Sequence, residues 1–123
     1  ASRIRAVERE SQTERGAKVY EIEGPLFFSS TNSFLEIFKP NKDPNLVIID
    51  FANSKVIDQS ALKAIEDIAE RYSKIGKQVK LRHLTKDCHR LLRRTGQLIV
   101  DSDDDPDYGV AVDYGVKIGI FGK

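Results

Sequence analysis

The feature that most constrains the fold is a short apolar run in the middle of the chain, at residues 46–51. It begins with four consecutive apolar residues, and only Asp50 separates these from Phe51. A continuous run rich in β-branched residues predicts a strand that is covered on both faces, as at the centre of a sheet with helices above and below. Because a membrane-spanning helix needs ~20 apolar residues, the run is far too short to cross a bilayer. It therefore predicts the central strand of an α/β domain.

Strand patterns flank this run on both sides. Polar and apolar residues alternate at residues 17–23 and 78–82, which predicts two half-buried strands. Gly24 and Pro25 are expected to end the first of them. Two further segments, residues 3–8 and 98–100, have the composition of short strands.

Helical patterns lie between the strands. Residues 29–32 are good helix caps and precede a short helix, and Asp58 and Gly76 are expected to bound the clearest helix of the chain. A third helix is expected to begin at Thr85. The buried stripe of the middle helix is predicted to comprise Ala61, Leu62, Ile65, Ile68, Ala69, Tyr72 and Ile75.

This order of elements predicts an α/β fold with a mixed central sheet of about 4–6 strands flanked by about 3–5 helices. We expect a single domain over residues 1–123, in which the conformation of residues 108–123 is left open. The chain contains no methionine, initiator included. We interpret this as the mark of a domain excised from a longer protein.

Composition narrows the class of protein. Hydrophobic residues make up 40% of the chain and charged residues 32%, which is typical of a globular domain. One cysteine cannot form an intrachain disulfide, which suits a reducing cytosol. The charged start of the chain does not resemble a secretory signal peptide.

The segment 53–61, which links the central strand to the clearest helix, is the first candidate site. Partners and ligands of open α/β sheets are met at the carboxyl ends of the strands. Asp58 is expected to cap the helix and Ser60 to lie in its first turn, where the helix N-terminus would stabilise a phosphate. The alternative, which spacing alone favours, is that Asp58 is only a cap and Ser60 a tolerated residue.

Charge is distributed unevenly, although the net charge is only +1. Residues 71–94 contain nine basic side chains and one acid, which is +8, whereas residues 95–113 contain six Asp and no base. Such a segment suits an acidic partner protein or an anionic membrane surface, and a solvated helix face is an equally favoured alternative. Nucleic acid is not expected, because the interleaved aromatic residues of a single-strand platform are missing. The predicted basic surface comprises Lys86, Arg90, Arg93 and Arg94.

Nothing in the sequence indicates catalysis or a metal site. Cys88 and His89 are adjacent on a predicted helix and so point about 100° apart, which does not suit a nucleophile and its base. Residues 101–107 resemble the start of a calcium loop but lack its glycine and its final glutamate. Neither His83 nor His89 has an obvious carboxylate partner. We therefore expect that the protein is not an enzyme.

Several segments together resemble the STAS domain, which is shared by anti-sigma-factor antagonists and by the cytoplasmic tails of SulP-type anion permeases. Two of these segments, 21–28 and 105–113, look more like the permease branch. The segments that carry the resemblance are residues 21–28, 47–50, 57–60, 79–84, 87–92 and 105–113.

The resemblance implies a non-catalytic interaction domain of a SulP-type transporter of sulfate, bicarbonate or dicarboxylates, at the cytoplasmic face of the inner membrane. Its implied partners are the transmembrane domain of the same transporter and a dimer mate or cytosolic protein. No cofactor is expected: some relatives bind nucleotides, but this chain has no glycine loop to cradle a phosphate.

The alternative is a free-standing phospho-switch of the antagonist branch. In that branch a kinase phosphorylates a serine at the position that matches Ser60. This chain departs from the pattern on either side of that serine, with Gln59 and Ala61 where the branch usually has Ser and Gly.

Overall fold

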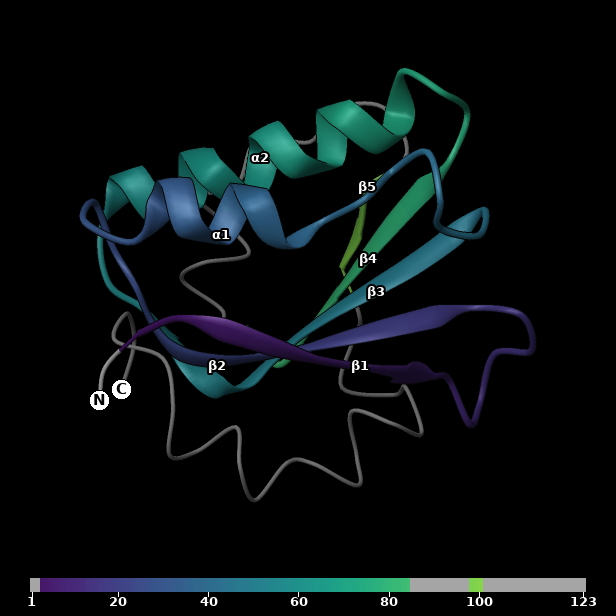
Figure 1. The fold of residues 1–123 in the computed structure, drawn as a ribbon, viewed down its shortest axis with the longest axis horizontal. Helices are drawn as coiled ribbons and strands as arrows, with labels where there is room; N and C mark the ends of the chain where they lie inside the picture. Colours follow the sequence, from purple (N-terminus) through teal and green to yellow (C-terminus); the bar gives the residue numbers. More distant parts are fainter. Residues whose placement is uncertain (1–2, 85–97, 101–123) are drawn as a thin grey trace.

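The protein is a five-stranded mixed sheet with two helices packed across it, as the computed structural model shows for residues 3–84 and 98–100 (Figure 1). In chain order the elements are β1 (Arg5–Glu10), β2 (Lys18–Leu26), α1 (Thr31–Ile37), β3 (Leu46–Val56), α2 (Gln59–Ser73), β4 (Gln78–Arg82) and β5 (Leu98–Val100).

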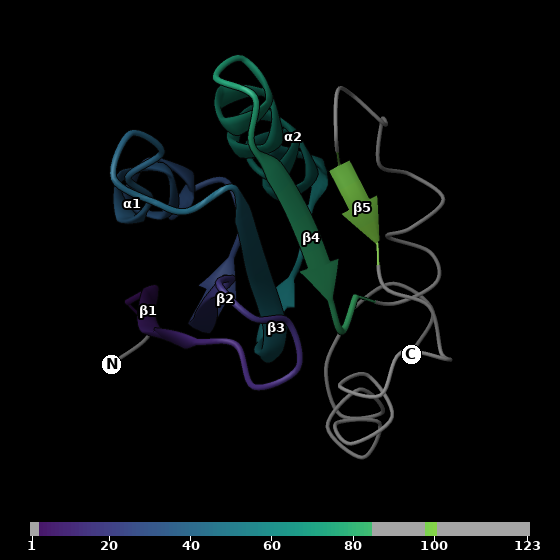
Figure 2. The same ribbon diagram turned by 90° about the vertical axis from the view of Figure 1, so that its right-hand side faces the viewer.

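The strands lie in the order β1-β2-β3-β4-β5, so spatial order follows chain order. β1 pairs antiparallel with β2, and every later pair is parallel. Parallel neighbours need a crossover, which α1 supplies between β2 and β3 and α2 between β3 and β4. Both helices lie on the same face of the sheet (Figures 1 and 2). The predicted mixed α/β fold is confirmed, with β3 at its centre.

The main core fills the space between this face and the two helices. From β3 it takes Val47, Ile49 and Phe51, whose side chains alternate with Ile48 on the opposite face. Ile48 is also fully buried, in a smaller cluster with Ala17 and Val19. Burial on both faces is thus confirmed for β3. The helices of the described segments cover one face only, and the helix expected from Thr85 lies outside those segments.

The prediction that Gly24 and Pro25 end a strand is wrong, because β2 continues through both of them to Leu26. Gly24 has φ +96°, and a Cβ there would lie 2.9 Å from the carbonyl oxygen of Arg3, so only glycine fits. Among the described strands, β2 pairs only with β3 beyond Glu23, where a proline disturbs fewer ladder hydrogen bonds.

Two further expectations about element ends are corrected. β3 runs to Val56, so the segment predicted as a turn from residue 53 begins as strand, and the turn itself is Ile57 and Asp58. Ile75 does not join the buried stripe of α2: the helix ends at Ser73, and Ile75 is 44% exposed.

A buried carboxylate lies at the end of the molecule where β3 starts. Asp43, in the loop between α1 and β3, accepts hydrogen bonds from the hydroxyls of Tyr20 and Tyr72, both 2.5 Å long. Its other oxygen accepts from Lys18 Nζ at 3.0 Å. The Asp43 side chain is 1% exposed, so these bonds form in a site that is almost closed to water. They tie the loop to β2 and α2 together.

The hydrogen bonds also decide how these groups titrate. Burial alone would raise the pKa of Asp43, but the hydrogen bonds from Tyr20, Tyr72 and Lys18 outweigh it and hold the pKa below its usual value of 3.8. Burial is the largest cause that raises the pKa of the Tyr72 hydroxyl, and the hydrogen bond to Asp43 is the next. The tyrosines therefore stay protonated as donors while Asp43 stays ionised.

Replacing Asp43 removes an acceptor that two buried hydroxyls and the partly exposed Lys18 share. We expect Asp43→Ala to lower the free energy of unfolding by about 3 kcal/mol or more, since each unpaired buried hydroxyl costs about 1–3 kcal/mol. Urea denaturation near neutral pH measures this. Asp67→Ala, which removes a partly exposed carboxylate of α2, is the matched control and should change stability by less than about 0.5 kcal/mol. Equal losses in the two variants would contradict the assignment.

The contribution of Asp43 should also depend on pH. Its folded pKa is below the unfolded value, so its stabilisation is complete above about pH 4 and is lost as the pH falls through the folded value. The stability difference between wild type and Asp43→Ala should therefore stay constant from about pH 7 to 5 and shrink below about pH 4. A difference that grows on acidification would contradict the lowered pKa.

Candidate functional site

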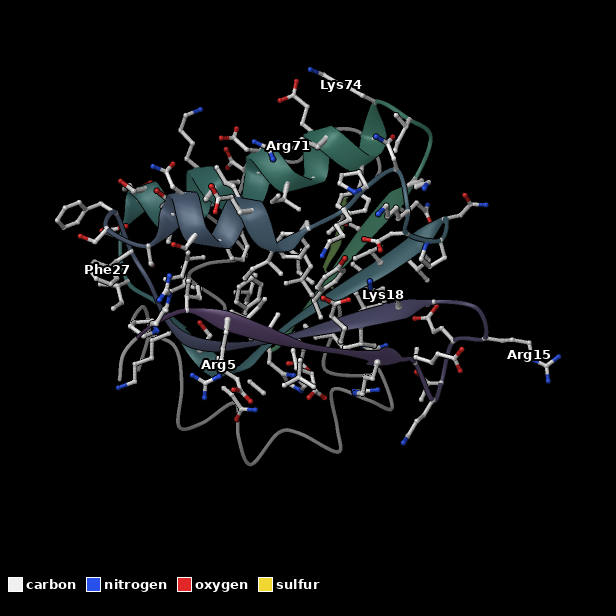
Figure 3. All side chains as sticks on the ribbon, in the orientation of Figure 1. Arg5, Arg15, Lys18, Phe27, Arg71 and Lys74 are labelled. Carbon is white, nitrogen blue, oxygen red and sulfur yellow. The ribbon has the colours of Figure 1, made fainter. Side chains whose placement is uncertain are left out.

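The candidate site lies at the carboxyl ends of β2 and β3. Both strands end at one edge of the sheet, and α1 and α2 begin directly above it (Figure 1). This is the edge at which open α/β sheets meet ligands and partners. The labelled Phe27 lies at this end of the molecule in Figure 3, whereas Lys18 lies toward the opposite end, where Asp43 is buried.

Asp58 joins the two turns at this edge. Its Oδ1 accepts the Ala61 N–H at 3.0 Å, which caps the N-terminus of α2 as predicted. Its Oδ2 accepts the Phe28 N–H, also at 3.0 Å, from the turn between β2 and α1. A backbone hydrogen bond from Ile57 N to Leu26 O, 3.0 Å long, runs beside it. One carboxylate therefore caps a helix and fixes a turn that is distant in sequence.

Ser60 follows this cap and is exposed in the first turn of α2. It lines an open groove of about 260 Å³ between α1 and α2. Lys63 and Asp67 lie along the same groove, one and two turns further into α2. Ser60 is thus accessible to a partner, two positions after Asp58, which caps the helix and is not among the residues that line this groove. The groove is lined by Thr31, Asn32, Leu35, Ser60, Lys63, Ala64 and Asp67.

Sequence reasoning missed two apolar side chains beside this pair. Phe28 is 69% exposed and Ile57 is 38% exposed, and they flank the hydrogen bond from Phe28 N to Asp58. Both belong to apolar runs that lead out of strands, so their pattern does not distinguish them from core residues. The available signal was their position just past each strand, where side chains meet solvent.

The basic residues between positions 71 and 94 do not form one surface in the part of the chain that is described. Lys77 donates to the carbonyl oxygens of Pro40 (2.6 Å) and Asp43 (2.5 Å). Lys80 pairs with Glu14, and Arg82 is 1% exposed. These cations serve internal contacts. The predicted basic surface of Lys86, Arg90, Arg93 and Arg94 lies outside the described residues and stays a prediction, as do the interpretations of Cys88, His89 and residues 101–107.

The expectation that His83 lacks a carboxylate partner is wrong. Its Nδ1 lies 2.6 Å from Oδ1 of Asp50, on the sheet face opposite the helices. The separation of 33 positions hid the pair, because only the parallel register of β3 and β4, which aligns Asp50 with Arg82, brings them together. Over residues 3–84 and 98–100, no three His, Cys, Asp or Glu side chains are placed to hold a metal ion.

A family model for the STAS domain matches residues 8–100, which is most of the chain. The chain belongs to the STAS domain family. The match runs from within β1 through β5 and includes the Asp58 turn. The predicted resemblance is thereby confirmed.

Relatives of this STAS domain include a protein named as a transporter and an antisigma-factor antagonist. It is 26% identical over 77 residues to a Bacillus subtilis (strain 168) protein named "Putative sulfate transporter YbaR"; the alignment covers 63% of the chain but only 16% of YbaR. A solved STAS domain of an antisigma-factor antagonist from Rhodobacter sphaeroides has 22% identity and a TM-score of 0.57, over 65% of this chain and 86% of the other.

Two solved transporter-family structures share the fold. The murine Solute Carrier 26 family member A9 anion transporter matches at a TM-score of 0.58 and 14% identity, over 95% of this chain and 22% of that protein. A sulfate transporter family protein from Wolinella succinogenes matches at 0.53 and 21% identity, over 88% and 94%. In the described part of this STAS domain, no helix is both long and apolar enough to span a membrane.

Removing the Asp58 carboxylate should weaken both the cap of α2 and the turn between β2 and α1. We expect Asp58→Ala to lower the free energy of unfolding by about 1–2 kcal/mol, the usual effect of losing an acidic N-cap. Asp58→Asn keeps a capping oxygen and should lose less. Thermal or urea unfolding of both variants beside wild type measures the difference. If Asp58→Ala is as stable as wild type, the carboxylate does not hold these turns.

Proposed function

We propose that this STAS domain is the cytoplasmic interaction domain of a SulP-type anion transporter, in the sulfate, bicarbonate or dicarboxylate class. The observation that carries the proposal is the sequence similarity to YbaR, a relative named as a sulfate transporter, of which this chain spans about a sixth. The likeness of fold to two transporter-family structures agrees with it. The domain works by binding, and its partners are the transmembrane domain of the same protein and a dimer mate or cytosolic protein.

The geometry suits a binding role. Hydrogen bonds to Asp58 hold the turn after β2 and the start of α2 in place. Ser60, Phe28 and Ile57 are exposed near these bonds. Because the turns are held by hydrogen bonds in the free domain, little conformational entropy is lost when a partner docks. A rigid surface of this kind can couple the domain to a membrane-embedded body without any chemical step.

The complete reading frame tests the transporter assignment. We expect it to encode several membrane-spanning helices before this domain, and its product to carry sulfate, bicarbonate or a dicarboxylate when expressed in uptake-deficient cells. Uptake of each labelled anion is measured with the full protein and with a truncation that lacks residues 8–100. The truncated protein should reach the membrane and lose most of its uptake. A reading frame without membrane helices would overturn the proposal.

A second candidate is a free-standing phospho-switch, favoured by the likeness to the antisigma-factor antagonist and by the exposure of Ser60. Phosphate on Ser60 would lie beside Lys63 and the N-terminus of α2, which favour negative charge. The chain is incubated with ATP and a serine kinase of the anti-sigma type from the same genome, and then examined by mass spectrometry. This candidate predicts phosphate on Ser60 and none on Ser60→Ala; equal labelling of both would exclude it.

A further inference from the structure

The hairpin of β1 and β2 extends beyond the helix that covers it. β2 has nine residues and α1 has seven, so the strand is about 30 Å long and the helix only about 10 Å. Figure 1 shows α1 over the start of β1 and the end of β2, while the hairpin end continues past it. A hollow of about 430 Å³ opens at this end, a volume typical of small-molecule sites. It is lined by residues 8–10, residues 16–18 and Pro44.

Three charged side chains of this hollow lie on the sheet face that carries the helices. Glu10 is paired with Lys18, and Glu8 with Tyr20, across the antiparallel ladder. Directly opposite residues share a face of the sheet, and so do residues two positions apart in one strand. Tyr20 belongs to the main core beneath the helices. Glu8, Glu10 and Lys18 therefore face the hollow from the same side.

The Lys18 ammonium group already has partners, whereas the carboxylates have oxygens to spare. Lys18 Nζ lies 2.7 Å from Oε1 of Glu8 and 3.0 Å from Oδ1 of Asp43. The Glu10 carboxylate makes no hydrogen bond or ion pair with the residues that the structure describes, and the pair with Lys18 engages only one oxygen of Glu8. The hydrogen-bonding groups that remain available in the hollow are therefore mainly carboxylate oxygens.

The other lining residues are apolar or direct their charge elsewhere. Arg9 stands opposite Val19 on the other sheet face, where its guanidinium group pairs with Glu21 at 2.7 Å. Arg15, next to the lining residues in sequence, extends from the tip of the hairpin into solvent (Figure 3). Pro44 and residues 16–17 carry no polar side chain. They supply a wall that suits the apolar part of a ligand.

We propose that this hollow binds an organic ammonium ion. Glu8 and Glu10 hold the ammonium group of the ligand, and its apolar part lies against Pro44 and residues 16–17. Charge-assisted hydrogen bonds of this kind are about twice as strong as neutral ones. Two carboxylates beside an apolar wall suit an organic cation better than a metal ion, because Ca²⁺ takes about 6–8 oxygen ligands. The inference goes beyond the proposed interaction role and does not rest on it, since the hollow lies at the end of the sheet away from the Asp58 turn.

Nitrogen–proton NMR of the isotope-labelled 123-residue chain tests the proposal, with phenylbutylamine as the probe. The amine should shift the amide signals of Glu10, Gly16 and Lys18 saturably, with a dissociation constant of about 1 mM or tighter. Phenylbutyrate, which carries a carboxylate on a similar apolar body, should not bind. Methylamine, which lacks the apolar body, should bind at least tenfold more weakly. Raising the salt from about 0.05 to 0.3 M should weaken binding of the probe, because the carboxylates are partly exposed.

Variants that remove charge but keep side-chain size locate the site. Glu10→Gln should weaken binding of phenylbutylamine at least threefold, and Glu8→Gln together with Glu10→Gln at least tenfold. Glu36→Gln is the matched control, because it neutralises an exposed carboxylate of α1 that does not line the hollow. It should change the affinity less than twofold. The NMR spectrum of each variant also shows whether the fold is kept.

Three results would overturn the inference: no saturable shift with phenylbutylamine, equal binding of phenylbutyrate or methylamine, or a loss in Glu10→Gln no larger than in Glu36→Gln. The transporter assignment can fail separately, because a reading frame without membrane helices leaves the affinity of this chain for the amine unchanged.

Discussion

The parallel pairing of β3 with both of its neighbours is the constraint on which the rest of the structure depends. Parallel strands can be joined only by a crossover, and α1 and α2 are the crossovers that lead into and out of β3. The carboxyl ends of β2 and β3 and the starts of both helices are thereby brought to one edge. The candidate site is a consequence of this arrangement and not of any single motif.

Two carboxylates then fix opposite ends of the layer in different ways. Asp43 is enclosed, and its partners Tyr20, Tyr72 and Lys18 make it a structural anchor between loop, sheet and helix. Asp58 lies at the other end, and its partners are backbone N–H groups of two turns. The Asp43 side chain is closed to solvent, whereas the Asp58 end presents Ser60 and Phe28 outward. This difference in exposure separates a carboxylate that only stabilises from a turn that can also bind.

Most of this fold could be predicted from the chain because it follows from local patterns. The bounds of β4 and β5, the burial of β3 and the cap at Asp58 came from alternation, apolar runs and capping chemistry. Errors arose where tertiary context overrides a local signal. β2 continues through Gly24 and Pro25 because it stays paired with β3 on one side. Glycine is needed at position 24 because the Arg3 carbonyl lies close to it.

The contacts that join distant residues could not be predicted. The pair of His83 with Asp50 depends on the register of β3 and β4. The pair of Asp43 with Tyr72 depends on the conformation of a loop whose prolines indicate only a turn. A hint existed in Tyr72, whose hydroxyl on an apolar helix face requires a buried partner. At the candidate site, the cap at Asp58 and the place of Ser60 in the first turn of α2 could be predicted from spacing. The exposure of Phe28 and Ile57 could not, because apolar residues next to strands resemble core residues.

The central claim is that the Asp58 carboxylate makes two turns into one preformed surface. Amide hydrogen exchange in wild type and Asp58→Ala tests it most directly, residue by residue. The account predicts that the Phe28 and Ala61 amides exchange at least tenfold faster in the variant, while the Gln78 amide, bonded to Asn45 O at the far end, is unchanged. Unchanged exchange at Phe28, or equal acceleration at all three amides, would contradict it.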